Sequence, residues 1–156
     1  MTEMTTEQHT AADCRLPVPP PPQLVLDGVS GSVRAGRAYA HQFMSYHRPD
    51  AGPDHIDDVL LVVSELVTNA VRYGTEPGDF VLLTLDADAD RTRIEVHDTA
   101  RRRPRRKPES ASRERGRGLL IVEALATWGL GERPMGKFVW AEVKAASAGS
   151  GAFPGR

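Results

Sequence analysis

The chain has 156 residues, a length that fits one domain with short tails. Its 20 basic and 21 acidic side chains give a net charge of -1, so overall charge creates no attraction to nucleic acid or to an anionic membrane. Cys14 is the only cysteine, which excludes an intrachain disulfide, and the histidines lack the spacing of metal ligands.

The composition divides the chain into three segments. Residues 1–22 are polar and end in a proline run, which predicts a disordered tail, although a proline-rich docking peptide is an alternative. Residues 23–144 carry the apolar patterns of a folded domain, and residues 145–156 form a second, small-residue tail. No apolar run could span a membrane and the first residues do not form a signal peptide, so we expect a cytoplasmic protein.

Apolar periodicity predicts the secondary structure of the middle segment. In chain order we expect a short strand at 23–26, helices at 30–44 and 53–74, strands at 79–85 and 92–98, a helix at 119–128 capped by Gly129, and a last strand at 137–143. An acidic hairpin turn at 86–90 favours antiparallel neighbours. These elements predict an α/β (α+β) two-layer sandwich with a mixed, mainly antiparallel sheet and helices on one face.

The helix at 53–74 carries the most informative pattern. Its apolar residues recur at three- and four-residue steps and form one stripe. Opposite that stripe Glu65, Asn69 and Arg72 fall within about 60° of one another on an α-helix. This polar line indicates either a covered site or an ordinary solvent-facing surface.

Several of these side chains have a physical use at a nucleotide. The Asn69 carbonyl oxygen can complete the shell of Mg²⁺, Arg72 can pair with phosphate, and Glu65 can accept a proton. Asp98, at a strand end, can accept a hydrogen bond from an exocyclic amine of a base. Gly118, together with Gly116, lets the backbone approach phosphate closely at the start of a helix.

Four segments together resemble a known family, the Bergerat-fold (GHKL) ATPases. The segments are SELVTNAVRYG as the asparagine box, IEVHDTA as the adenine-contacting strand, RGRGLLIVEALATWG as the second glycine box and GKFVWAEV as the closing strand. The sequence is most similar to the anti-sigma-factor serine/threonine protein kinases, the small stand-alone histidine-kinase-like domains of actinomycetes. The resemblance spans residues 24–143, most of the chain.

The resemblance implies an ATP-binding regulatory kinase that needs Mg²⁺. Such a kinase phosphorylates an antagonist protein, binds a sigma factor and often dimerises, and we expect no direct binding to nucleic acid. The implied roles are the catalytic base for Glu65, the metal ligand for Asn69, phosphate contact for Arg72, adenine recognition for Asp98, and wrapping of the phosphates by Gly116, Arg117, Gly118 and Leu119.

Two departures from the family pattern lead to an alternative function. Thr99, Ala100 and Arg101 follow the strand-end aspartate where small residues are usual, and Phe138 stands where a threonine is common. Both departures predict weaker ATP binding, so a module of the same fold that sequesters a partner without catalysis is the alternative. The arginine-rich segment 101–107 fits a solvated lid, a lid over the triphosphate, or a contact patch for an acidic protein or nucleic acid.

Overall fold

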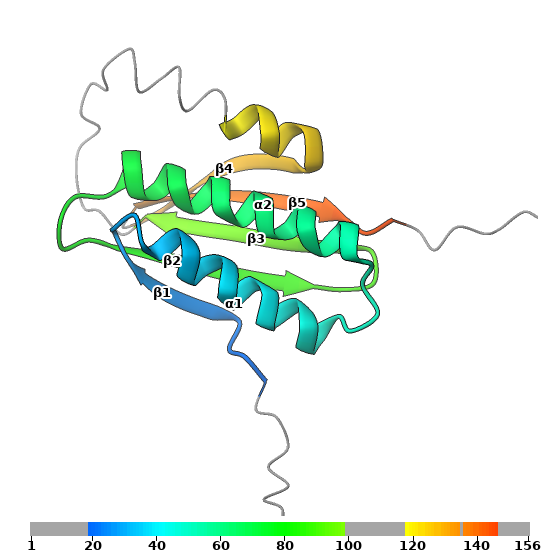
Figure 1. Ribbon diagram of the computed structural model, residues 1–156. Helices are drawn as coiled ribbons and strands as arrows, with labels where there is room; N and C mark the ends of the chain where they lie inside the picture. The colour runs from blue at the N-terminus through cyan, green and yellow to red at the C-terminus, as the bar shows by residue number, and fades with distance from the viewer. Residues whose placement is uncertain (1–18, 99–117, 135, 147–156) are drawn as a thin grey trace, which may run out of the picture.

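The computed structural model describes residues 19–98, 118–134 and 136–146 (Figure 1). Along this part of the chain the elements are β1 (Gln23–Asp27), α1 (Ser32–His47), α2 (Pro53–Asn69), the π-helical turn η1 (Ala70–Gly74), β2 (Phe80–Ala87), β3 (Arg91–Asp98), a helix over residues 118–125, β4 (Thr127–Arg133) and β5 (Gly136–Lys144).

The strands form one sheet in the order β1-β2-β3-β5-β4, and every neighbouring pair is antiparallel. Both α1 and α2 lie across one face of this sheet (Figure 1). The predicted two-layer sandwich with helices on one face is therefore confirmed. The expectation of a mixed sheet is wrong for the described strands, because each pair of neighbouring strands is antiparallel.

Alternation along the strands builds the core between the two layers. Val81, Leu83 and Leu85 of β2 face the helices and are at most 3% exposed, as are Ile94 and Val96 of β3. The apolar stripe of α2 packs against them and includes the fully buried Val59, Val63 and Val67. Because the apolar stripe faces the sheet, the polar residues Glu65, Asn69 and Arg72 face away from the centre of the sheet.

The predicted helix at 53–74 is confirmed in extent but not in type. α2 begins at Pro53, where a missing N–H costs little, and helical structure continues to Gly74. Its last turn, η1, is π-helical, and this wider turn is rare and frequently found at functional sites. Apolar spacing does not distinguish an α-turn from a single π-turn.

The helix predicted at 119–128 is shorter in the structure, and a strand was missed. Helical residues end at 125 and β4 begins at Thr127, so Gly129 is not a helix cap but pairs with Trp140 of β5. A Cβ on Gly129 would lie 2.7 Å from the Trp140 ring, and one on Gly131 would overlap the Phe138 ring. Gly129, predicted as a helix cap, and Gly131 are thus the positions of β4 over which the two aromatic rings of β5 lie.

These rings lie on the sheet face opposite the helices. Phe138 stacks on His97 with 4.8 Å between ring centroids, and the Arg93 guanidinium lies 4.7 Å from the Trp140 ring centroid. Arg93 also contacts Glu95 and Glu142, each at 3.0 Å. The charged side chains of this face therefore pair with one another along neighbouring strands.

The Gly131–Phe138 contact predicts the effect of a single added methyl group. Gly131→Ala should lower the free energy of unfolding by about 1–3 kcal/mol, because the Phe138 ring must leave its place over β4. Urea unfolding would measure this loss. Gly31→Ala, with no atom within 4 Å of the added Cβ, should be near neutral. If Phe138→Ala does not remove the cost of Gly131→Ala, the ring contact is not its cause.

A buried histidine links the start of α2 to the sheet. His55 is 7% exposed, and its Nε2 lies 2.9 Å from the Thr92 hydroxyl oxygen of β3. The Thr92 hydroxyl also contacts the Met44 sulfur of α1 at 3.7 Å, so this cluster joins both helices to the sheet. Burial, reinforced by the positive charge of Arg48, holds the pKa of His55 below its usual value.

The lowered pKa of His55 predicts a loss of stability in mild acid. The unfolded chain takes up this proton near pH 6.5, at a higher pH than the folded protein does. The free energy of unfolding should therefore fall as pH drops below about 6.5 and level off below the folded pKa. Urea unfolding between pH 7 and 5 should show that the free energy of unfolding depends less on pH in His55→Gln than in the wild-type protein.

Candidate functional site

The polar line of α2 meets the helix over residues 118–125. Glu65 and Asn69 lie one turn apart on α2, and a Cβ on Gly118 would lie 2.8 Å from Glu65 Oε2. The same Cβ would lie 3.5 Å from Asn69 Nδ2 and 3.6 Å from Asn69 Oδ1. The structure therefore brings Glu65, Asn69 and Gly118 into direct contact, although they are far apart in the sequence.

Burial distinguishes this contact from an ordinary surface. Asn69 is only 8% exposed, Gly118 is buried and Glu65 is half-buried. Val122, one turn after Gly118, is fully buried and fixes its helix on the core. The pair of polar side chains on α2 is thus covered by backbone, so the interpretation of this face as simply solvent-facing is wrong at these two residues.

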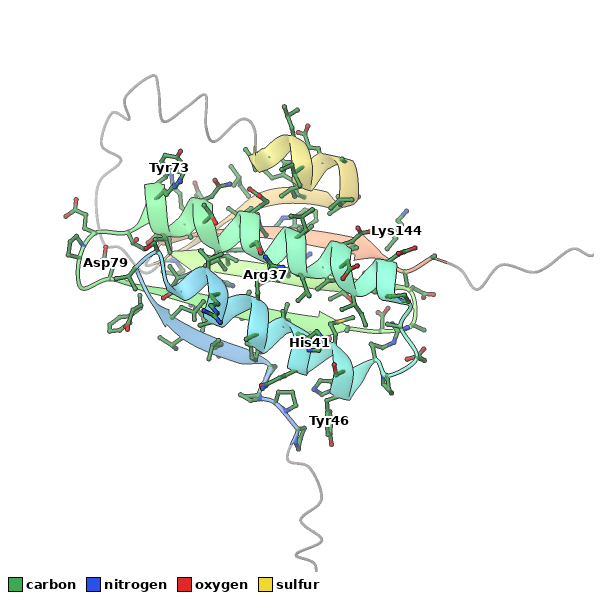
Figure 2. The ribbon with its side chains drawn as sticks, in the orientation of Figure 1. Arg37, His41, Tyr46, Tyr73, Asp79 and Lys144 are labelled. Carbon is green, nitrogen blue, oxygen red and sulfur yellow. The ribbon has the colours of Figure 1, made fainter. Side chains whose placement is uncertain are left out.

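Arg72 does not share this cover. It lies in η1, where the wider turn rotates the chain by a smaller angle per residue than the α-helix assumed from the sequence. Its side chain is exposed, and Tyr73 beside it projects from the end of the segment (Figure 2). The predicted line of three is therefore the half-buried Glu65 and the buried Asn69, followed by an exposed arginine.

A second contact places Asp98 beside the end of the same helical segment. A Cβ on Gly74 would lie 2.7 Å from Asp98 Oδ2 and 3.1 Å from its Cγ. Asp98 is the last residue of β3, so the strand end and the C-terminal end of η1 meet at this carboxylate. The sequence marked Asp98 as a candidate but treated Gly74 only as a helix stop.

Some predicted site residues lie outside the described chain. Gly116 and Arg117 are among them, as are Thr99–Arg101 and the rest of the arginine-rich segment 101–107. Leu119 is described and half-buried next to Gly118. The roles expected for all of these residues stay predictions.

Phe138 lies away from these contacts. It pairs with His97 and stacks on it, on the sheet face opposite α2, while its neighbour Val139 packs against the core. The Phe138 ring therefore lies on the other side of the sheet from α2, and it gives no reason to expect weaker ATP binding beside that helix. Strand alternation would have shown this from the sequence, had the inward residues of the last strand been assigned first.

The comparison with known protein families agrees with this geometry. Residues 30–128, more than half of the chain, match the family described as the histidine kinase-like ATPase domain. The chain belongs to the histidine kinase-like ATPase family. No curated protein matches its sequence. Membership of this family indicates an ATP-binding domain with a regulatory function.

The donor groups of this histidine kinase-like ATPase domain fit Mg²⁺ bound together with ATP. The described residues contain no cluster of three or more His, Cys, Asp or Glu side chains that could hold a metal. Mg²⁺ commonly takes only one or two protein ligands and completes its shell with water and phosphate oxygens. A single Asn69 oxygen beside the Gly118 backbone fits this mode of Mg²⁺ binding, in which the protein supplies few of the ligands.

No helix among the described residues is both long enough and apolar enough to cross a bilayer.

The Gly118 contact predicts how a methyl group affects nucleotide binding. Gly118→Ala should lower ATP affinity at least 10-fold, because the added Cβ displaces the Glu65 carboxylate and crowds Asn69. Calorimetric titration with ATP and Mg²⁺ would measure this. Gly52→Ala, with no atom within 4 Å of the new Cβ, should bind ATP as wild type does. Equal affinities of the two variants would contradict the assignment of the site.

Proposed function

We propose that this domain is an ATP-dependent protein serine/threonine kinase of the anti-sigma-factor type. In this proposal it transfers the γ-phosphoryl group of ATP to a serine or threonine of an antagonist protein and thereby controls a sigma factor. The contact of Glu65 and Asn69 with Gly118 carries the proposal. The family membership and the motif resemblance over residues 24–143 support it.

Each residue has a defined task in this proposal. Asn69 offers its carbonyl oxygen to Mg²⁺, and Asp98 accepts a hydrogen bond from the adenine amine. Bound with ATP, Mg²⁺ would neutralise charge on the phosphates. Glu65, one turn before Asn69, would take the proton of an incoming hydroxyl. Arg72 contacts phosphate from the exposed side.

The phosphate cover comes from the start of the second helix. Gly116, Arg117, Gly118 and Leu119 would wrap the triphosphate, with backbone N–H groups and the positive end of the helix dipole directed at it. The partners in this proposal are a sigma factor, an antagonist protein and a second copy of the chain. Direct binding to nucleic acid and to membranes is not part of the proposal, and we place its action in the cytoplasm.

A partner-sequestering module without catalysis is the second candidate function. The sequence Thr99-Ala100-Arg101 favours it, because stiffer and more charged residues follow Asp98 than the family pattern has. Phe138 no longer supports this candidate, since its ring lies on the opposite face of the sheet. A sequestering module could still bind ATP, so a phosphate-transfer assay distinguishes the two candidate functions better than an ATP-binding assay.

The catalytic assignment predicts the behaviour of Glu65→Gln. Transfer of labelled phosphate from ATP to an antagonist protein should fall by about 10²–10⁴-fold, because the amide cannot accept the hydroxyl proton. ATP affinity should stay within about 3-fold of wild type, since Gln keeps the size of Glu. Glu132→Gln, an exposed site on β4, is the matched control and should transfer phosphate normally.

Three outcomes of this assay have distinct meanings. Unchanged transfer by Glu65→Gln would remove Glu65 as the base. ATP binding without transfer to any antagonist protein tried would favour the sequestering module. A wild-type protein that shows no heat and no thermal shift at millimolar ATP would overturn the nucleotide proposal as a whole.

A further inference from the structure

We infer that Gly74 and Gly136 are positioning residues that set the preference for adenine by fixing where Asp98 stands. This inference rests on the proposed nucleotide site and adds the origin of its base specificity. It concerns two glycines on separate elements, η1 and β5, that both contact the last residue of β3.

Gly74 makes room for the carboxylate. Ordinary contacts of a Cβ begin at about 3.4 Å, yet a Cβ here would lie 2.7 Å from Asp98 Oδ2 and 3.1 Å from Cγ. The Asp98 side chain therefore rests directly on the Gly74 backbone. Any other residue at position 74 would push the carboxylate away by several tenths of an ångström.

Gly136 makes room for the main chain of the same residue. A Cβ on Gly136 would overlap the Asp98 carbonyl oxygen, and Gly136 has a φ of +153°, which L side chains rarely adopt. Asp98 also pairs with Val81 of β2, and the preceding His97 pairs with both Leu82 and Phe138. Backbone thus confines Asp98 from η1, β2 and β5.

A carboxylate confined in this way can distinguish adenine from guanine. An ionised carboxylate only accepts hydrogen bonds, so it binds the 6-amino group of adenine and repels the 6-carbonyl oxygen of guanine. A site built around such a bond rejects a base that cannot make it, provided the geometry is held. A shift of about 1 Å can cost up to about 100-fold, so the two glycines determine how strongly adenine is preferred.

The test compares Gly74→Ala with wild type by calorimetric titration of ATP, GTP and inorganic triphosphate, each with Mg²⁺. ATP affinity should fall at least 10-fold, and the ATP-over-GTP ratio should fall by a similar factor. The affinity for triphosphate, which has no base, should not change. Gly52→Ala is the control and should match wild type for all three probes.

Three results would overturn the inference. In the first, Gly74→Ala keeps the wild-type ATP-over-GTP ratio. In the second, it loses affinity for all three probes equally, as general loosening of the fold would cause. In the third, the wild-type protein binds ATP without preference over GTP, which leaves the proposed function standing. A wild-type protein that binds no ATP defeats both proposals.

A double variant keeps the test decisive if Gly74→Ala folds poorly. Asp98→Ala removes the crowded Cγ and Oδ2 atoms and leaves a Cβ at an ordinary 3.5 Å from the position 74 Cβ. Gly74→Ala added to Asp98→Ala should therefore change neither the melting temperature nor any of the three affinities. A double variant that melts below Asp98→Ala by as much as Gly74→Ala melts below wild type would show that the defect does not act through the Asp98 carboxylate.

Discussion

The contact between the Gly118 backbone and the Glu65 and Asn69 side chains is the constraint on which the rest of the site depends. Two helices can approach this closely only if one of them offers no side chain at the contact. The apolar stripe of α2 and the buried Val122 hold both helices on the same sheet face, so the approach is fixed by the core. Polar groups that would otherwise face solvent are thereby enclosed beside backbone.

The sequence predicted elements with a clear period and missed those without one. The stripe from Val59 to Val67 made the central helix unambiguous, and alternation made β2 and β3 equally clear. β4 was missed because Gly129 and Gly131 interrupt any alternation, and their purpose lies in rings on another strand. The π-turn of η1 was missed because the residue types do not show whether one turn has α-helical or π-helical backbone hydrogen bonds.

The site was predictable only in part, for a similar physical reason. Helical spacing put Glu65 and Asn69 together, but nothing in residue composition says that Gly118 lies against them; only the family resemblance did. The neighbours of Asp98 were invisible, since Gly74 and Gly136 act by lacking a side chain. The effect of Phe138 on ATP binding was inferred from the family pattern alone, and the structure places its ring on the sheet face away from α2.

A single residue, Ala126, separates the helix over residues 118–125 from β4, and its N–H still donates to the Val122 carbonyl at 2.8 Å. A connection of one residue does not allow the helix and β4 to move independently. Were the helix to rock against α2, the outermost strand would be dragged with it, and with that strand Leu130, whose side chain is 72% exposed. The position of this helix against Glu65 is therefore tied to the position of the exposed edge strand β4.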